Sequence, residues 1–260
     1  MSGLTVYTLY SGSSGNCVYI SSQNAKILID AGKSARTLVD SLNNAGGDPF
    51  ELDSIFVTHG HSDHVAALAT LMKQRRIPVH MTEETAADVR AHNPYKVDTI
   101  VVHPREYEYS VGDLTVSSFP TPHDSPGSVG YIISSPAETV GIATDLGYVT
   151  KGIFARLSKC DRVIIESNYD EEMLKNGPYP YPLKQRIRSQ QGHLSNSECA
   201  RLVSALADKG VRSFLLAHLS AENNTPECAL AASCSALVEG GHKDDALIAV
   251  ADRFFPTYFE

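Results

Sequence analysis

The sequence of 260 residues lacks tryptophan, has only five cysteines, and contains no apolar run long enough to cross a bilayer. No basic stretch followed by an apolar one marks a secretory signal near its start. The cysteines form no C-x-x-C pair, which disfavours both a disulfide scaffold and a cysteine-ligated zinc ribbon. We therefore expect a cytoplasmic protein that makes no membrane contact.

Basic residues are also scarce, because 22 Lys and Arg stand against 30 Asp and Glu, a formal net charge of −8. This balance excludes a protein that coats polyanions through general positive charge, but it allows an enzyme with a local positive site. Apolar residues make up 42% of the chain and charged residues 20%, which is typical of a globular protein. No internal repeat or Pro/Gly-rich linker divides the chain, so we expect one domain over residues 1–260.

Apolar patterning predicts short strands through the first half of the chain and an alternation of strands and helices in the second. Strands are expected at 4–9, 18–21, 26–29, 54–58, 114–119, 162–165, 213–217 and 247–250. Helices are expected after Ser34, whose hydroxyl suits an N-cap, and over 196–208 and 226–239. Strands in two groups, with helices between and after them, predict an α/β protein with two sheets covered by helices.

The densest chemical signal is the run from His59 to His64, with three imidazoles and one carboxylate directly after a buried strand. His59 and His61 alternate along an extended turn and can converge on one ion. Asp63 and His64 open the next helix and point towards a second ion. Such a density of histidines is typical of a metal site, and it rarely arises by chance.

This motif resembles that of the metallo-β-lactamase-fold hydrolases, and the later motifs of that superfamily follow in order. His123 stands in the run 121–125, Asp145 in the run 143–147, and His218 in the run 215–220, each at the end of an expected strand. The resemblance implies a four-layer αββα fold, in which two mixed sheets pack face to face with helices outside.

The resemblance also implies a ligand set for two divalent ions. One ion would be held by His59, His61 and His123, the other by Asp63, His64 and His218, with Asp145 and a water or hydroxide bridging them. Asp30 matches an early acid of the superfamily that supports the histidine motif by hydrogen bonds without binding metal. These nitrogen and oxygen donors suit Zn²⁺ but also accept Mn²⁺ or Fe²⁺, so the native ion stays open.

Ligands alone do not choose a substrate, but two later residues narrow the branch. Glu166 at a strand end, followed by His193 in a Gly-His-Leu-Ser-Asn run, is similar to the pair in ribonuclease Z-like phosphodiesterases, whose histidine faces the scissile phosphate. With the loop 12–16, these motifs most resemble the YycJ/WalJ family of bacterial proteins, over residues 5 to about 255. The resemblance implies a two-metal phosphodiesterase or nuclease, foremost a 5′-to-3′ DNA exonuclease, with nucleic acid as its partner.

The implied mechanism assigns catalytic roles to Asp63, His193 and Glu166. Two ions that share a hydroxide lower the pKa of that water from 15.7 to about 7, and Asp63 would orient this nucleophile. His193 would donate a proton to the departing sugar oxygen. Glu166 would hold the imidazole of His193 and raise its pKa, because opposite charges favour the protonated form.

Five residues are expected to meet the phosphates of the substrate: Ser14, Asn16, Asn168, Arg186 and Arg188. The N–H groups of the loop 12–16 suit a phosphate cradle, although a Ser/Gly/Asn loop is also an ordinary turn. The segment 173–197 carries four cations and no acid around His193. A solvated basic loop is the alternative interpretation of that segment.

Other functions stay open on the sequence alone. A small-molecule or cyclic-nucleotide phosphodiesterase would use the same chemistry, and a non-catalytic metal-binding regulatory module would keep the ligands without turnover. A redox enzyme is disfavoured because His61 stands where the flavodiiron pattern has Glu. Four histidines match no motif and are expected at the surface, namely His80, His92, His103 and His242. The sequence predicts no oligomeric state.

Overall fold

The computed structural model describes residues 3–74, 76–92 and 99–260, and the chain divides into two compact units. Unit 1 comprises Met1–Pro120, Ser125–Glu138 and Asp252–Glu260. Unit 2 comprises Thr121–Asp124 and Thr139–Ala251. The expected single domain stays a prediction. Among the described residues, none of the helices combines the length and apolar character that a membrane span requires.

Unit 1 contains a mixed sheet of seven strands in the order β14-β1-β2-β3-β4-β5-β6. Its strands are β1 (Thr5–Tyr10), β2 (Cys17–Ser21), β3 (Lys26–Ile29), β4 (Ser54–Phe56), β5 (Val79–Thr82), β6 (Ile100–His103) and β14 (Thr257–Tyr258). The strands from β14 to β3 pair antiparallel, whereas those from β3 to β6 pair parallel. The parallel strands β3 and β4 therefore end at the same edge of the sheet, where Asp30 and the histidine motif follow them.

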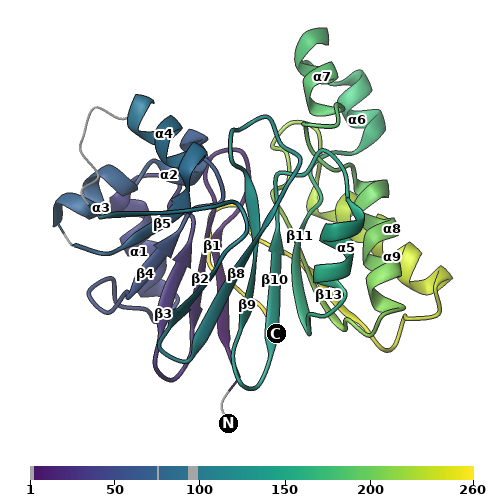
Figure 1. The fold of residues 1–260 in the computed structure, drawn as a ribbon. Coiled ribbons are helices and arrows are strands. Elements are labelled where there is room, and N and C mark those ends of the chain that lie inside the picture. The colour runs from purple at the N-terminus through teal and green to yellow at the C-terminus, as the bar shows by residue number, and fades with distance from the viewer. Residues whose placement is uncertain (1–2, 75, 93–98) are drawn as a thin grey trace. The chain divides into compact units, whose positions relative to one another are not determined.

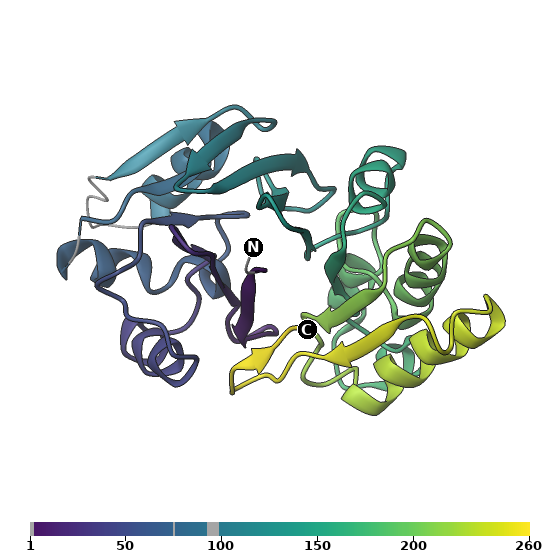
Figure 2. The ribbon, with the colours of Figure 1, turned by 90° about the horizontal axis from the view of Figure 1, so that it is seen from below.

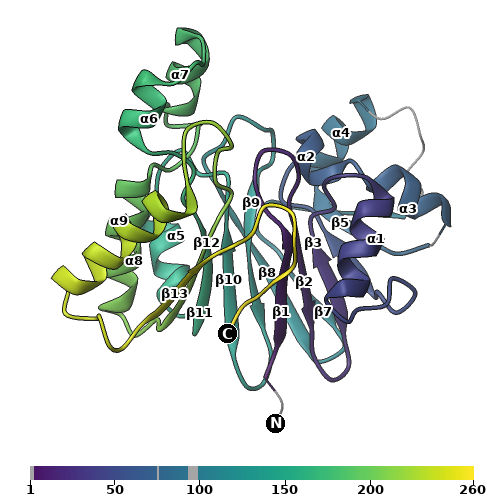
Figure 3. The same ribbon diagram turned by 180° about the vertical axis from the view of Figure 1, so that it is seen from behind.

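Helices cover the outer face of this sheet, as Figures 1 and 3 show. They are α1 (Ala35–Asn44), α2 (Ser62–Val65), α3 (Leu68–Gln74) and α4 (Glu83–His92). The Ser34 hydroxyl accepts the N–H of Thr37 at 3.1 Å, which confirms the predicted cap of α1. Leu38 and Leu42 of α1 are fully buried in the core beneath. This packing anchors the helix that follows the turn at residues 30–33.

Unit 1 also holds three antiparallel strands of a second layer: β7 (Glu108–Val111), β8 (Leu114–Pro120) and β9 (Val129–Ser134). The Tyr131 hydroxyl of β9 donates to the carbonyl of Val57 at 2.8 Å, directly after β4. The ring of Tyr131 also meets that of Phe56 edge-on, with centroids 5.9 Å apart. Strands of the two layers thus pack face to face within unit 1, as the resemblance implies.

Unit 2 is built on four parallel strands: β10 (Thr139–Ala143), β11 (Arg162–Glu166), β12 (Ser213–Ala217) and β13 (Leu247–Val250). Its helices are α5 (Lys151–Leu157), α6 (Glu171–Asn176), α7 (Tyr181–Ile187), α8 (Asn196–Ala207) and α9 (Pro226–Glu239). Figure 3 shows α5, α8 and α9 against these strands, whereas α6 and α7 stand beyond the strand ends. Figure 2, seen from below, shows the helices of this unit beside its strands. Because the strands are parallel, the residues that follow β10, β11 and β12 share one edge.

Candidate functional site

Asp30 follows β3 directly and adopts a left-handed backbone with φ 63°, which is uncommon for residues other than glycine. Its buried carboxylate accepts the N–H and the hydroxyl of Thr58, both at 2.8 Å. It also lies 2.7 Å from Nδ1 of His64. Since a carboxylate only accepts, Nδ1 carries the proton and Nε2 of His64 is left with a lone pair suited to a metal.

His59 and His61 bring two ring nitrogens together within unit 1. Nε2 of His59 lies 3.1 Å from Nδ1 of His61, and Nδ1 of His59 lies 3.0 Å from the Thr58 hydroxyl. Two nitrogens bound to one tetrahedral ion at 2.0–2.1 Å would lie roughly 3.3 Å apart. The spacing of the two histidines therefore fits joint ligation of a single ion.

Asn16 lies against the acidic end of the same motif. Its amide nitrogen is 3.2 Å from Oδ2 of Asp63 and 3.1 Å from Nε2 of His64, while its amide oxygen accepts the N–H of Gly12 at 2.9 Å. The side chain is buried, so it ties the loop 12–16 to the histidine motif. Ser14 in that loop is exposed. Contact of either residue with substrate stays a prediction.

In unit 2, Asp145 and His218 follow β10 and β12 and also have left-handed backbones, with φ 59° and 56°. Oδ1 of Asp145 lies 3.6 Å from Nε2 of His123 and 3.6 Å from Nδ1 of His218. The other nitrogen of His123 is 3.2 Å from the carbonyl of Gly192. Strained, buried residues at strand ends are typical of functional sites.

Glu166 ends β11 and is fully buried, yet it is shared by two histidines. Its Oε1 lies 2.8 Å from Nδ1 of His193 and 2.8 Å from Nδ1 of His218. Its Oε2 accepts the N–H groups of Leu146 at 2.9 Å and Leu194 at 3.1 Å. The sequence predicted the contact with His193 but missed the one with His218. Asp145, Glu166, His193 and His218 each offer one possible metal-ligand atom, and these four atoms lie within 4.8 Å of one another.

Burial and charge act in opposite directions on the Glu166–His193 pair. Burial raises the pKa of Glu166, but the imidazoles of His193 and His218 hold that pKa below its ordinary value. Burial lowers the pKa of His193, but the Glu166 carboxylate raises it above its ordinary value overall. The pair therefore favours an imidazolium beside a carboxylate, and the ring of His193 keeps some exposure to solvent.

Asn168 lies beside His218 and the segment that carries His193. Its side-chain amide donates to the carbonyl of His218 at 2.7 Å, and its N–H donates to the carbonyl of Leu194 at 2.9 Å. The N–H of Ser220 in turn donates to the carbonyl of Asn168 at 2.8 Å. Asn168 is buried and holds the strained turn at His218 in place. Its contact with substrate stays a prediction.

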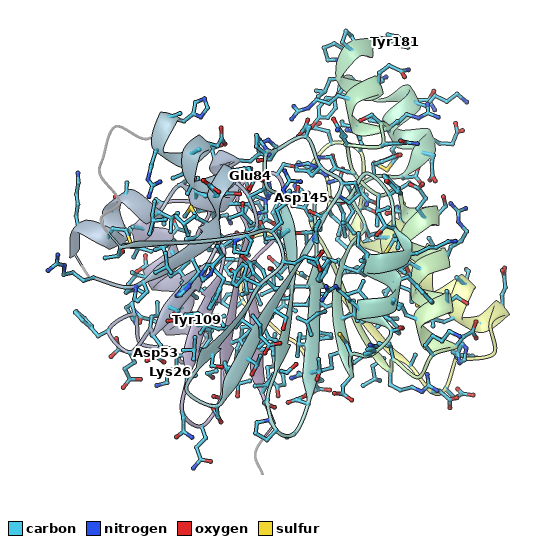
Figure 4. The ribbon with its side chains drawn as sticks, viewed as in Figure 1. Lys26, Asp53, Glu84, Tyr109, Asp145 and Tyr181 are labelled. Atoms are coloured by element: carbon cyan, nitrogen blue, oxygen red, sulfur yellow. The ribbon has the colours of Figure 1, made fainter. Side chains whose placement is uncertain are left out.

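The two predicted arginines lie at the end of α7, and both are exposed. Arg186 forms an ion pair with Asp124, next to His123 in the sequence, and this hydrogen bond raises the pKa of Arg186. Arg188 is the C-cap of α7, which is anchored by Ile187 packing with Tyr169 and Leu174. Figure 4 shows Tyr181, the first residue of α7, at the tip of this helix.

Two findings lie outside the sequence predictions. Thr58 contacts Asp30, His59 and His64 through one hydroxyl, and only its position before the motif could have pointed to it. The expected surface position of His80 is wrong, because β5 is an inner strand and buries the side chain completely. Its ring stacks on Phe56 with centroids 4.6 Å apart.

Comparison with known proteins places these residues in context. Residues 25–219 match a family model described as the Beta-lactamase superfamily domain. The exodeoxyribonuclease WalJ of Streptococcus pneumoniae serotype 2 is 33% identical over 231 residues, covering 87% of this chain and 86% of the relative. The exodeoxyribonuclease YycJ of Bacillus anthracis is 31% identical over 245 residues, covering 92% and 91%.

A solved structure extends the likeness to the fold. The metallo-beta-lactamase fold protein YhfI from Bacillus subtilis superposes with a TM-score of 0.76, covering 98% of this chain and 100% of that one. At 16% identity this likeness shows the fold alone.

Proposed function

Because the chain belongs to the beta-lactamase superfamily, and within it to the family of the WalJ and YycJ exodeoxyribonucleases, we propose that it is a metal-dependent nuclease. In its most specific form it removes nucleotides from DNA in the 5′-to-3′ direction. The observation that carries the proposal is Glu166, whose one oxygen holds both His193 and His218. A cytoplasmic location belongs to the same proposal and is supported by the five free cysteines.

The donors of both units fit divalent ions of the first transition row. Imidazole nitrogens and carboxylate oxygens are the ligands that zinc, manganese and iron accept. The spacing of His59 and His61, and the 3.6 Å separation of Oδ1 of Asp145 from Nε2 of His123, support ligation. The proposed sets are His59, His61 and His123 for one ion, Asp63, His64 and His218 for the other, and Asp145 for both.

Bound divalent ions would activate a water molecule and bind a phosphate oxygen. The chain's own residues orient the reactants and move protons. The Asp63 carboxylate accepts a hydrogen bond from the attacking water and thereby fixes its direction. His193, held through Nδ1 by Glu166, is left with Nε2–H to protonate the departing sugar oxygen.

A small-molecule phosphodiesterase is the second candidate, and one observation favours it. Of the four cations in segment 173–197, Arg186 is paired with Asp124 and Lys175 with Glu172. These pairs reduce the positive charge that a long polyanion would meet. Arg188 and Lys184 form no ion pair within the part of the chain that the structure describes, and they remain for a polymer backbone.

One experiment separates the candidates. The purified protein, with Mn²⁺ or Zn²⁺, is incubated with a DNA duplex labelled at either end and with bis(p-nitrophenyl) phosphate. A nuclease of the proposed polarity releases the 5′ label first, as a mononucleotide, and shortens the 3′-labelled strand progressively. Cleavage of the small ester with intact DNA would favour the small-molecule enzyme. Bound metal without cleavage of either substrate would indicate a regulatory module and contradict the proposal.

A further inference from the structure

Lys33 lies outside the predicted catalytic and metal residues but has an unusual setting in unit 1. Its ammonium lies 4.5 Å from the ring centroid of Tyr10 and 5.1 Å from that of Phe254. It also donates to the carbonyl of Arg253 at 2.9 Å. Tyr10 is buried, whereas Phe254 is 59% exposed and presents its ring to solvent. A cation and an accessible aromatic ring therefore share one place on the surface of this unit.

The segment that carries Phe254 is held in a defined shape. The Asp252 carboxylate accepts the N–H of Phe254 at 2.7 Å and that of Phe255 at 2.9 Å. The N–H of Asp252 donates to the Thr257 hydroxyl at 2.9 Å, and β14 then pairs with β1. Figure 3 shows this C-terminal segment running back beside β1. The Asp252 carboxylate thus forms its hydrogen bonds with the backbone of this turn.

The loop 12–16 lies against Lys33. A Cβ atom added to Gly15 would meet Cγ of Lys33 at 2.3 Å, so the two residues are in close contact. Ser13 and Ser14 are exposed, and their backbone N–H groups donate to no partner within the described residues. The same loop ends at Asn16, which contacts Asp63 and His64. The loop 12–16, which carries N–H donors at the surface, therefore joins Lys33 to the histidine motif within unit 1.

The backbone of Lys33 adds a second indication. Its φ of 59° is left-handed, a conformation that glycine adopts at lower cost. Strained residues persist only where the surrounding structure over-determines them, and they cluster at active sites and ligand clamps, so a lysine in this conformation points to a binding site.

We propose that Lys33, Phe254 and the loop residues Ser13 and Ser14 form a binding platform for an unpaired end of nucleic acid. A base stacks on the ring of Phe254, while a phosphate meets the Lys33 ammonium and the loop N–H groups. Aromatic rings beside cations are how proteins hold single strands without sequence preference, and successive N–H groups suit phosphate oxygens. The inference rests on the proposed nuclease function, and it assigns the binding of an unpaired end of the substrate to unit 1.

A duplex interior does not fit this platform, because stacking on a side chain requires a base that is free of its neighbours. The alternative of a lipid surface would use Phe254 together with the neighbouring Phe255, which is 69% exposed, as apolar side chains that insert beside cations. The stacked cation and the loop N–H donors favour a base and a phosphate instead.

The test measures binding by fluorescence anisotropy with the metal-loaded protein and a 3′-labelled single strand of phosphorothioate linkages, which resist hydrolysis. A second strand has the same backbone but lacks its first three bases at the 5′ end. Phe254→Ala should weaken binding of the complete strand about 5- to 160-fold, the effect of losing one stacked base. It should leave binding of the abasic strand unchanged.

Lys33→Met should weaken binding of both strands and reduce the salt slope by about one, and Lys33→Arg should restore most of the affinity. Matched controls are Phe50→Ala, at a phenylalanine that is 80% exposed, and Lys26→Met, at a lysine beside Asp53 in Figure 4. Neither control should change binding. Melting temperatures of all variants establish that they are folded.

An equal loss on both strands, or no loss, for Phe254→Ala would overturn the platform. Sedimentation with phosphatidylglycerol vesicles that depends on Phe254, with unchanged strand binding, would replace it with a membrane surface. The two proposals fail separately. Hydrolysis of DNA with no role for Phe254 removes the platform alone, whereas Phe254-dependent binding without hydrolysis by the wild type removes the nuclease alone.

Discussion

One oxygen of Glu166 contacts two imidazoles, and the other accepts two backbone N–H groups. Because the acceptor is a carboxylate, these buried hydrogen bonds are charge-assisted. Such a carboxylate orients both His193 and His218, and it raises the pKa of His193 and so favours its protonated form. The same arrangement explains why the pKa of Glu166 stays low although burial alone would raise it. At this scale one side chain links a proposed proton donor to a proposed metal ligand.

Glu166→Gln tests that link through the pH dependence of cleavage. A general acid works only while protonated, so the rate falls as pH rises through its pKa. The carboxylate raises the pKa of His193, and its loss should therefore move this fall in kcat to lower pH. The measurement is a pH–rate profile on DNA. It is made at saturating metal, because the substitution also removes the partner of His218, a proposed metal ligand. Glu172→Gln, at an exposed residue of α6, is the control, and identical profiles for Glu166→Gln and wild type would refute the pairing.

At the scale of elements, strands deliver the candidate residues to the sheet edges. Asp30, Asp145 and His218 follow β3, β10 and β12, and each has a left-handed backbone that turns the chain sharply. Their positions at strand ends were predictable because apolar runs mark the strands. The contacts of Asn16 and Asn168 were not, since each joins residues about 50 positions apart in the chain. The burial of His80 was missed because a histidine interrupts the apolar pattern of β5.

Gly32 provides a test of the turn after β3. A Cβ atom there would lie 1.9 Å from the carbonyl oxygen of Asp63, a backbone atom that cannot move without the histidine motif. Gly32→Ala should therefore lower the free energy of unfolding by roughly 1–3 kcal/mol, as overpacking does, and weaken metal binding. The measurement is denaturant unfolding with and without metal. Gly152→Ala in α5, where a Cβ meets only an ordinary contact at 3.7 Å, should be harmless.

His80 in β5 predicts an acid sensitivity of unit 1. Burial lowers the pKa of His80 from 6.5 to about 4, so the unfolded chain binds the proton more readily. Stability from this group is complete above about pH 6.5 and is lost as pH falls towards 4, by about 3 kcal/mol in all. His80→Phe keeps a ring beside Phe56 and should flatten this part of the stability–pH curve. His92→Gln, at an exposed histidine, should leave the curve as it is; an unchanged curve for His80→Phe would contradict the assignment.

At the scale of the whole molecule, a net charge of −8 and a nucleic-acid substrate are compatible because the charges are arranged locally. Asp63 and Asp145 belong to the proposed ligand sets, where they face cations rather than phosphates. Lys33 in unit 1 lies against the loop 12–16, which contacts Asp63 and His64. Arg188 in unit 2 follows Ile187, whose carbonyl accepts the N–H of His193. The composition excludes a protein that coats polyanions through general positive charge, whereas the structure supports binding through a few local cations.

The most direct test of the proposed chemistry is His193→Ala, assayed for metal content and for cleavage of two substrates. The departing sugar oxygen of DNA needs a proton, so DNA cleavage should fall by roughly 10²–10⁴, the usual worth of a general acid. Nitrophenolate leaves without protonation, so hydrolysis of bis(p-nitrophenyl) phosphate should fall far less, with metal content unchanged. Unchanged DNA cleavage, or an equal loss on both substrates with metal retained, would contradict the role of His193.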